Sequence, residues 1–192
     1  MARTKAFEPQ KALDAALEVF WTLGYDNASL EVLLAAMGIA KQSLYDTFGD
    51  KRSLFMLAMQ QYRRNTITSM QRMLATAPTV REGFAALLHG LAAETREQHE
   101  RGCLLLSANL QRNLDDEAVA SFLQENNDEV ESVFCAALRQ AQQRGELRAE
   151  ADPQALARFL IVSVQGMRAM ARLKSDRAAL AQVADLALAA LH

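Results

Sequence analysis

Residues 29–48 read SLEVLLAAMGIAKQSLYDTF, a pattern of two short helices joined by a tight turn. Ser29 can cap the first helix, because its hydroxyl accepts hydrogen bonds from the free amide N–H groups of the first turn. Apolar residues recur at the helical period as far as Gly38, and glycine tolerates the positive φ at which many helices end. A second helix can begin near Ala40 with Leu44 facing inward. The stretch therefore predicts a helix-turn-helix unit.

The second helix of this unit has polar side chains on the face opposite Leu44. Gln42, Tyr45 and Asp46 occupy that face, and Lys41 lies at the N-terminal end of the helix. In one interpretation this helix enters the major groove of DNA, as the second helix of such units does. The same turn also joins ordinary helical hairpins, so the spacing alone leaves both interpretations open.

Short motifs surround this stretch in a characteristic order. They are Gly24-Tyr25, Ser29-Leu30, Met37-Gly38-Ile39, Ser43-Leu44-Tyr45 and Phe48-Gly49-Asp50-Lys51-Arg52-Ser53-Leu54-Phe55. Their order and spacing resemble the amino-terminal signature of the tetracycline-repressor (TetR) family, over the third of the chain from Pro9 to about Tyr62. The resemblance implies an N-terminal helix-turn-helix DNA-binding domain, residues 1–50 with the motif at 29–48. It also implies a C-terminal helical ligand-binding and dimerisation domain, residues 51–192.

Composition agrees with an all-α fold. The 192 residues are 51% hydrophobic, with only 3 Pro and 8 Gly and 6% aromatics, which disfavours a β-rich chain. A chain of this length can bury a core without disulfides or metal, so we expect no cofactor and reduced cysteines. No apolar run reaches the roughly 18 residues that span a bilayer, and Met1 to Glu8 lack the apolar core of a signal peptide. We therefore expect a cytoplasmic protein.

Capping and stop signals predict nine helices, the architecture typical of TetR-like proteins. Thr79 opens a capping box, Asp152 followed by Pro153 caps a later helix, and Ser175 caps the last. The expected helices run over roughly 9–24, 29–37, 40–48, 51–75, 79–102, 103–113, 117–145, 152–174 and 175–192.

The DNA-binding residues follow from the resemblance, position by position. They are Ser29, Ala40, Lys41, Gln42, Ser43, Tyr45, Asp46, Thr47 and Lys51. Lys41, Tyr45 and Lys51 suit contacts with phosphate. The net charge is only −2, so any positive surface must be local. The basic residues that could form it are Arg3, Lys5, Lys11, Lys41, Lys51 and Arg52.

Three of these positions depart from the usual TetR pattern. Gln42 stands where family members often have a small residue, and a glutamine there can pair with adenine N6 and N7, so we expect it to read a base. Asp46 would be repelled by phosphates unless it accepts from a cytosine N4 amino group or pairs with a nearby basic residue. Thr47 stands where the family often has a ring, so a hydroxyl contact replaces a stacking contact.

The last two helices carry apolar stripes rich in small residues. The resemblance implies that they form a two-fold four-helix bundle with a second copy of the chain. The predicted interface residues are Leu156, Phe159, Leu160, Val164, Met167, Leu180, Val183, Ala184, Ala187 and Leu188. The alternative is that both helices simply cover the core of their own chain.

The C-terminal domain is expected to bind a small-molecule inducer in an apolar cavity. Its candidate lining residues are Met59, Phe84, His89, Cys103, Phe122, Phe134, Met167 and Met170. The alternative for each is a place in the ordinary core, which is the commoner position for such side chains. Cys103 is also a candidate redox sensor, because a helix N-terminus and Arg101 would favour its thiolate. Cys135 lies in a helical stripe and is expected to be an inert core thiol. His89, His99 and His192 are too scattered for a metal site.

These observations favour a DNA-binding transcriptional regulator, a homodimeric repressor whose partners are a pseudo-palindromic operator, a second copy and an unidentified inducer. The chain has no glycine-rich phosphate loop, metal cluster or nucleophile with a base, so catalysis is not expected. The alternative is a helical module that uses the same face to bind a protein, and Asp46 is the residue that most favours it.

Overall fold

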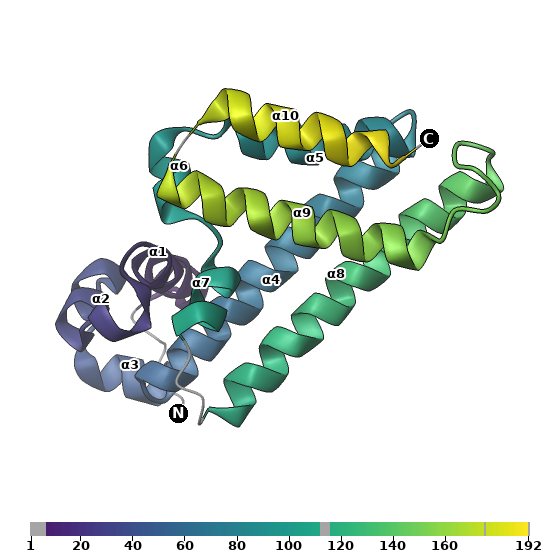
Figure 1. Ribbon diagram of the computed structural model, residues 1–192. Helices are drawn as coiled ribbons and strands as arrows, with labels where there is room; N and C mark the ends of the chain where they lie inside the picture. The colour runs from purple at the N-terminus through teal and green to yellow at the C-terminus, as the bar shows by residue number, and fades with distance from the viewer. Residues whose placement is uncertain (1–6, 112–115, 175, 192) are drawn as a thin grey trace. The chain divides into compact units, whose positions relative to one another are not determined.

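The computed structural model describes residues 7–111, 116–174 and 176–191, and every regular element in these ranges is a helix (Figure 1). The all-α expectation is confirmed. No helix among these residues is long and apolar enough to cross a membrane. The helices are α1 Pro9–Asn27, α2 Leu30–Met37, α3 Lys41–Phe48, α4 Lys51–Thr76, α5 Val80–Ala93, α6 Arg96–Arg101, α7 Leu104–Gln111, α8 Glu117–Gln143, α9 Pro153–Leu173 and α10 Arg177–Ala189.

The chain divides into two compact units. Unit 1 comprises Met1–Arg64 with Cys103–Val119, and unit 2 comprises Asn65–Gly102 with Ala120–His192. This division falls within α4, whereas the sequence suggested a boundary just before that helix. The reason is side-chain packing: the buried Gln61 of α4 donates to Asp14 and accepts from Gln10, both on α1. The first half of α4 therefore belongs with α1 in unit 1.

Aromatic residues hold α1 and the first half of α4 together in unit 1. Phe20 and Phe55 meet edge to face with ring centroids 5.0 Å apart, and Tyr25 lies 4.9 Å from Phe55. Trp21 of α1 and Tyr62 of α4 make a second edge contact at 4.9 Å. Gly24, the expected end of the first helix, has φ 76° and interrupts α1 by a kink. A non-glycine residue would be strained in this conformation.

The two helices of the predicted helix-turn-helix form as expected. Ser29 Oγ accepts from the Val32 amide at 3.2 Å and so caps α2. Gly38 ends α2 in the left-handed region, with φ 63° and ψ 33°. Leu33 and Leu44 are fully buried, so each helix turns its apolar side toward the interior of unit 1. These local signals therefore set both the turn and the inward faces.

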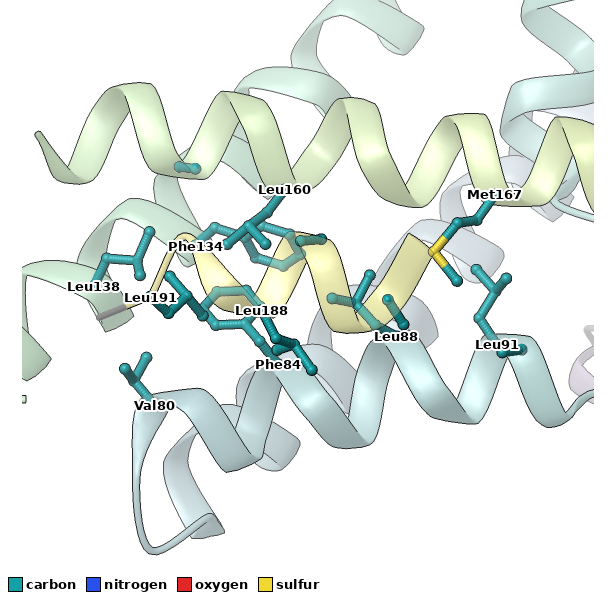
Figure 2. Packing of buried hydrophobic residues seen from close by; sticks show 14 of the residues in the cluster. Val80, Phe84, Leu88, Leu91, Phe134, Leu138, Leu160, Met167, Leu188 and Leu191 are labelled. Carbon is teal, nitrogen blue, oxygen red and sulfur yellow. The ribbon is translucent and has the colours of Figure 1, made fainter. Parts of the chain in front are cut away.

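The core of unit 2 is built from α5, α8, α9 and α10, as Figure 2 shows. Phe84 of α5 and Phe134 of α8 meet edge to face with ring centroids 4.9 Å apart. Leu88 and Leu160 are fully buried in the same cluster. Helix α10 packs against both α5 and α9. The last two helices therefore complete the core of their own chain.

The segment expected as one helix over 79–102 is two helices, α5 and α6. Thr95 caps α6 in a capping box: its Oγ1 accepts from the Gln98 amide at 3.2 Å, and Gln98 Oε1 accepts from the Thr95 amide at 2.7 Å. The described ranges therefore contain ten helices. The sequence Thr95-Arg96-Glu97-Gln98 carries the capping-box signature, which could have located this break.

The caps of α9 and α10 show one further difference. Asp152 Oδ1 accepts from the Gln154 amide at 2.9 Å and the Ala155 amide at 3.2 Å, so the predicted cap of α9 is confirmed. Ser175, the expected cap of the last helix, lies outside the described residues. Asp176 caps α10 instead, accepting from the Ala179 amide at 3.1 Å. A carboxylate serves this position as well as a hydroxyl does.

Candidate nucleic-acid interface

Helix α3 has one buried face and one exposed polar face. Leu44 and Phe48 are buried. The predicted DNA-binding residues lie on the remaining surface: Ala40, Lys41, Gln42, Tyr45 and Asp46 are exposed, and Ser43 and Thr47 are half-buried. The structure thus gathers the α3 residues of the predicted set on one side of a short helix, where a partner can reach them.

The N-terminus of α3 has amide groups available for an anion. Ala40 occupies the N-cap position and makes no side-chain capping bond. The first N–H groups of a helix lack intrahelical partners and carry partial positive charge, which favours a phosphate oxygen. Lys41 is the first residue of the helix and is exposed, so its charge adds to this effect.

Gln42 and Asp46 are joined by a hydrogen bond. Gln42 Nε2 donates to Asp46 Oδ1 at 2.8 Å, across one turn of α3. The sequence suggested a basic residue or a cytosine as the partner of this carboxylate. The structure supplies the neighbouring glutamine, which is the other unusual residue on this face.

The start of α4 fixes a second basic position. Asp50 Oδ1 accepts from the Ser53 amide at 2.7 Å, and this bond is the main cause that lowers the pKa of Asp50. Lys51 Nζ lies 4.5 Å from the centroid of the Tyr25 ring, a cation–π distance. Burial is the main cause that raises the pKa of Tyr25. Lys51 is therefore held beside the first turn of α4 by a neutral ring.

Arg52, by contrast, is engaged by a carboxylate of its own unit. Its Nε and Nη2 donate to Asp116 Oδ2 and Oδ1 at 2.9 and 2.7 Å. Asp116 also accepts from the Val119 amide at 3.1 Å and so caps α8. These hydrogen bonds, with Arg52 first, lower the pKa of Asp116 to about 2. Arg52 was expected to be available for phosphate, but here it joins the starts of α4 and α8. Of the other basic candidates, Arg3 and Lys5 lie outside the described residues.

Replacement of Asp116 by Asn should remove the acid-sensitive part of this contact. The pKa of Asp116 is below its ordinary value of 3.8, so the pair stabilises the fold above about pH 4, and that stability is lost as the pH falls toward about 2. We expect the free energy of unfolding of the Asn variant to fall less than that of wild type as the pH is lowered over this window. The Asn side chain keeps an oxygen for the Val119 amide but has no charge to lose. Urea unfolding from pH 5 to pH 2 measures this.

The matched variant is Arg52→Gln, which removes the other partner. Arg52→Gln should lose only part of the pH dependence, because the Val119 amide still lowers the pKa of Asp116. The double variant should match Asp116→Asn, since no carboxylate remains at position 116. A wild-type profile retained by either single variant would contradict the role given to the pair.

The residues predicted to bind a ligand fall in both units. Phe84, Phe134 and Met167 lie in the core of unit 2, Met59 is fully buried in unit 1, and Phe122 is buried. Two others lie nearer the surface. Met170 is 57% exposed on α9, and the partly exposed His89 has its Nε2 3.2 Å from Asp185 Oδ1 at the surface of unit 2. Met170 belongs to an outward stripe of α9, which its type alone could not reveal.

The predicted dimer residues also need correction. Leu160, Met167, Leu180, Ala184, Ala187 and Leu188 are buried in the core of their own chain, and Leu156 and Val164 pack against it. Phe159 and Val183 are exposed. The exposed apolar residues of the last two helices are Phe159, Val162, Met170, Leu173, Val183 and Leu186, here called the C-terminal apolar face. Sequence reasoning chose the more regular stripe, which the chain buries itself.

The two cysteines differ in environment. Cys135 on α8 is buried, as the sequence indicated, and Cys103 is partly exposed. Cys103 directly precedes α7, and its carbonyl accepts from the Ser107 amide at 2.9 Å. Because α7 packs against α1 within unit 1, Cys103 lies in the same unit as the helix-turn-helix.

Comparison with known proteins finds family models that match two regions of the chain. Residues 12–57 match the bacterial regulatory proteins of the tetR family, and residues 78–187 match the tetracyclin repressor-like C-terminal domain. The chain is 31% identical to the uncharacterized HTH-type transcriptional regulator YezE of Bacillus subtilis over 193 residues, covering 100% of both chains. It is 29% identical to the HTH-type transcriptional repressor ComR of Escherichia coli, covering 97% of this chain and 90% of that one.

One similar protein has been solved in complex with its operator DNA. The TetR family regulator CifR, solved as a cysteine mutant with a 26-base-pair operator duplex, is 34% identical. Its TM-score is 0.87, and the match covers 99% of this chain and 100% of CifR. Members of this family are transcriptional regulators and not enzymes. With both of its regions matched, the chain belongs to the TetR family of DNA-binding transcriptional regulators.

Proposed function

We propose that this regulator is a homodimeric repressor that binds a pseudo-palindromic operator and is released by a small-molecule inducer. The observation that carries the proposal is the exposed polar face of α3, with Lys41 at an uncapped helix N-terminus. ComR is described as a repressor, and CifR was solved on operator DNA. A regulator of this kind acts in the cytoplasm, where the bacterial chromosome lies.

Two kinds of DNA contact are assigned to this surface. Lys41, Tyr45 and Lys51 meet phosphates, with Ser29, Ala40, Ser43 and Thr47 at the edge of the contact, and these interactions position the helix without reading sequence. Gln42 reads a base in the major groove through its amide. Arg52 adds little to phosphate binding while Asp116 holds it.

The second copy of the chain is assigned to the C-terminal apolar face. Val162 and Leu186 are 67% and 74% exposed there. Large apolar side chains that are exposed to water favour association with another surface. A two-fold axis through α9 and α10 would bury this face against itself and form a four-helix bundle. Dimerisation would present two α3 helices to half-sites about one DNA turn apart.

The inducer is assigned to unit 2, and α4 is the proposed route of coupling. This helix is continuous from Lys51 to Thr76, with its first part in unit 1 and the remainder in unit 2. A molecule that binds one conformation of unit 2 more tightly would shift the population toward it and reduce operator affinity by the same coupling energy.

Selection of duplexes from a random pool tests the proposed function. Purified wild-type protein should enrich a pseudo-palindrome, and Lys41→Ala with Tyr45→Ala should abolish that enrichment, because two phosphate contacts per half-site are lost. Arg139→Ala is the matched control, since Arg139 is exposed on α8 in unit 2. If folded dimer at low salt enriches no duplex, the protein-interaction alternative replaces this proposal.

Cys103 supports a second route of release. An adduct on this partly exposed thiol would change the packing of α7 against α1, within the unit that carries the helix-turn-helix. We expect alkylation to weaken operator binding by about tenfold, equivalent to about 1.4 kcal/mol. Cys103→Ser should be insensitive to the reagent. Unchanged operator affinity after complete alkylation of Cys103, verified by mass spectrometry, would exclude this route.

A further inference from the structure

The hydrogen bond between Gln42 and Asp46 constrains the one side chain on α3 assigned to base reading. Both residues are exposed, and they lie one helical turn apart. The Nε2 group of Gln42 donates to Asp46 Oδ1 at 2.8 Å. This contact lies within the surface proposed to face DNA. Its effect on recognition follows from the chemistry of the two groups.

An ionised carboxylate only accepts hydrogen bonds, whereas an amide has a donating and an accepting end. Asp46 therefore holds the NH₂ end of the Gln42 amide toward itself. Rotation of the amide by 180° would bring Oε1 against a carboxylate oxygen, which is repulsive. One N–H of Gln42 is used in this bond, and the second N–H and Oε1 remain as a donor and acceptor pair of fixed orientation.

That pair matches the major-groove edge of adenine. Adenine offers an acceptor at N7 and a donor at N6, which complement one N–H and one carbonyl oxygen. Guanine offers two acceptors, N7 and O6, so Oε1 would face O6 without a hydrogen between them. We propose that Asp46 is a positioning residue that fixes the Gln42 amide for adenine and against guanine. The inference rests on the proposed entry of α3 into the major groove.

Asp46 also has an opposing effect on affinity. A carboxylate near the phosphates weakens binding to every sequence, because the protein then neutralises less of the DNA charge. Removal of Asp46 should therefore have two separable results. Affinity for random duplexes should rise, and the preference for adenine at one position of each half-site should fall.

The test compares wild type, Gln42→Ala, Asp46→Ala, Asp46→Asn and the double alanine variant by duplex selection. Adenine should exceed guanine at one position by about tenfold or more in wild type, as expected for a bidentate contact. Gln42→Ala should remove this preference, and Asp46→Ala should reduce it to about twofold at the same position. Asp46→Asn should give a preference between those of wild type and Asp46→Ala, because its side-chain oxygen can still accept from Nε2 but its NH₂ group can also donate to Oε1.

The double variant and the Asn variant distinguish the positioning role of Asp46 from two alternatives, a purely electrostatic effect and direct reading of a base. If Asp46→Asn and Asp46→Ala both raise affinity for all duplexes and leave the adenine preference intact, Asp46 acts only through its charge and the positioning role is overturned. If Asp46→Ala changes a different position, and does so also in the Gln42→Ala background, Asp46 reads a base directly and the role is again overturned. A wild type that enriches no duplex would overturn the proposed function itself, and with it this inference.

Discussion

Leu186→Glu should convert the protein from a dimer to a monomer and remove detectable operator binding. Leu186 is 74% exposed on α10, within the C-terminal apolar face. In a two-fold interface one substitution occurs twice, so two carboxylates would have to leave water and face apolar side chains. Loss of an interface hot spot costs about 2 kcal/mol or more per copy, and about 4 kcal/mol is roughly a thousandfold in Kd.

Sedimentation velocity at micromolar concentration measures this change, with operator affinity as the second readout. Ala178→Glu is the matched control, because it adds the same charge to the same helix. Ala178 is exposed and lies seven residues before Asp185, on the side of α10 where the chain already carries a charge. A Leu186→Glu variant that remains dimeric would show that the dimer uses another surface.

Phe84→Ala should lower the free energy of unfolding by about 3 to 5 kcal/mol, the range for truncation of a buried phenylalanine. Phe84 is fully buried and meets Phe134 edge to face in the core of unit 2 (Figure 2). Its removal loses apolar burial and leaves a cavity in the core built by α5, α8, α9 and α10. Urea denaturation gives the free energy. Leu23→Ala, at a residue 40% exposed on α1, should cost less than about 1 kcal/mol.

The same measurement distinguishes two roles of Phe84. The sequence named it as a residue that could line an inducer cavity, and a side chain against an open cavity makes fewer contacts than one in close-packed core. A loss below about 1 kcal/mol would therefore contradict the core role and favour the cavity. A loss in the expected range would remove Phe84 from the search for the inducer site.

Near neighbours in the sequence determined the helix-turn-helix. The cap at Ser29, the left-handed Gly38 and the inward Leu44 depend on contacts within a few residues, so the sequence predicts them directly. The capping box at Thr95 is equally local, and the break between α5 and α6 was readable for the same reason. The exposed positions of Lys41 and Gln42 follow once Leu44 is known to be buried.

Contacts between distant residues were decided only by the tertiary structure. Asp116 meets Arg52 across 64 positions, and no local pattern distinguishes that carboxylate from its acidic neighbours. Helices α9 and α10 carry apolar residues on more than one face. Which face is buried depends on the side chains of α5 and α8 that pack against these helices. The chain buries Leu160 and Leu188 and leaves Val162 and Leu186 exposed, because only one side of each helix packs against the core of the chain. Periodicity identifies a stripe, but only the packed partner determines which stripe is buried.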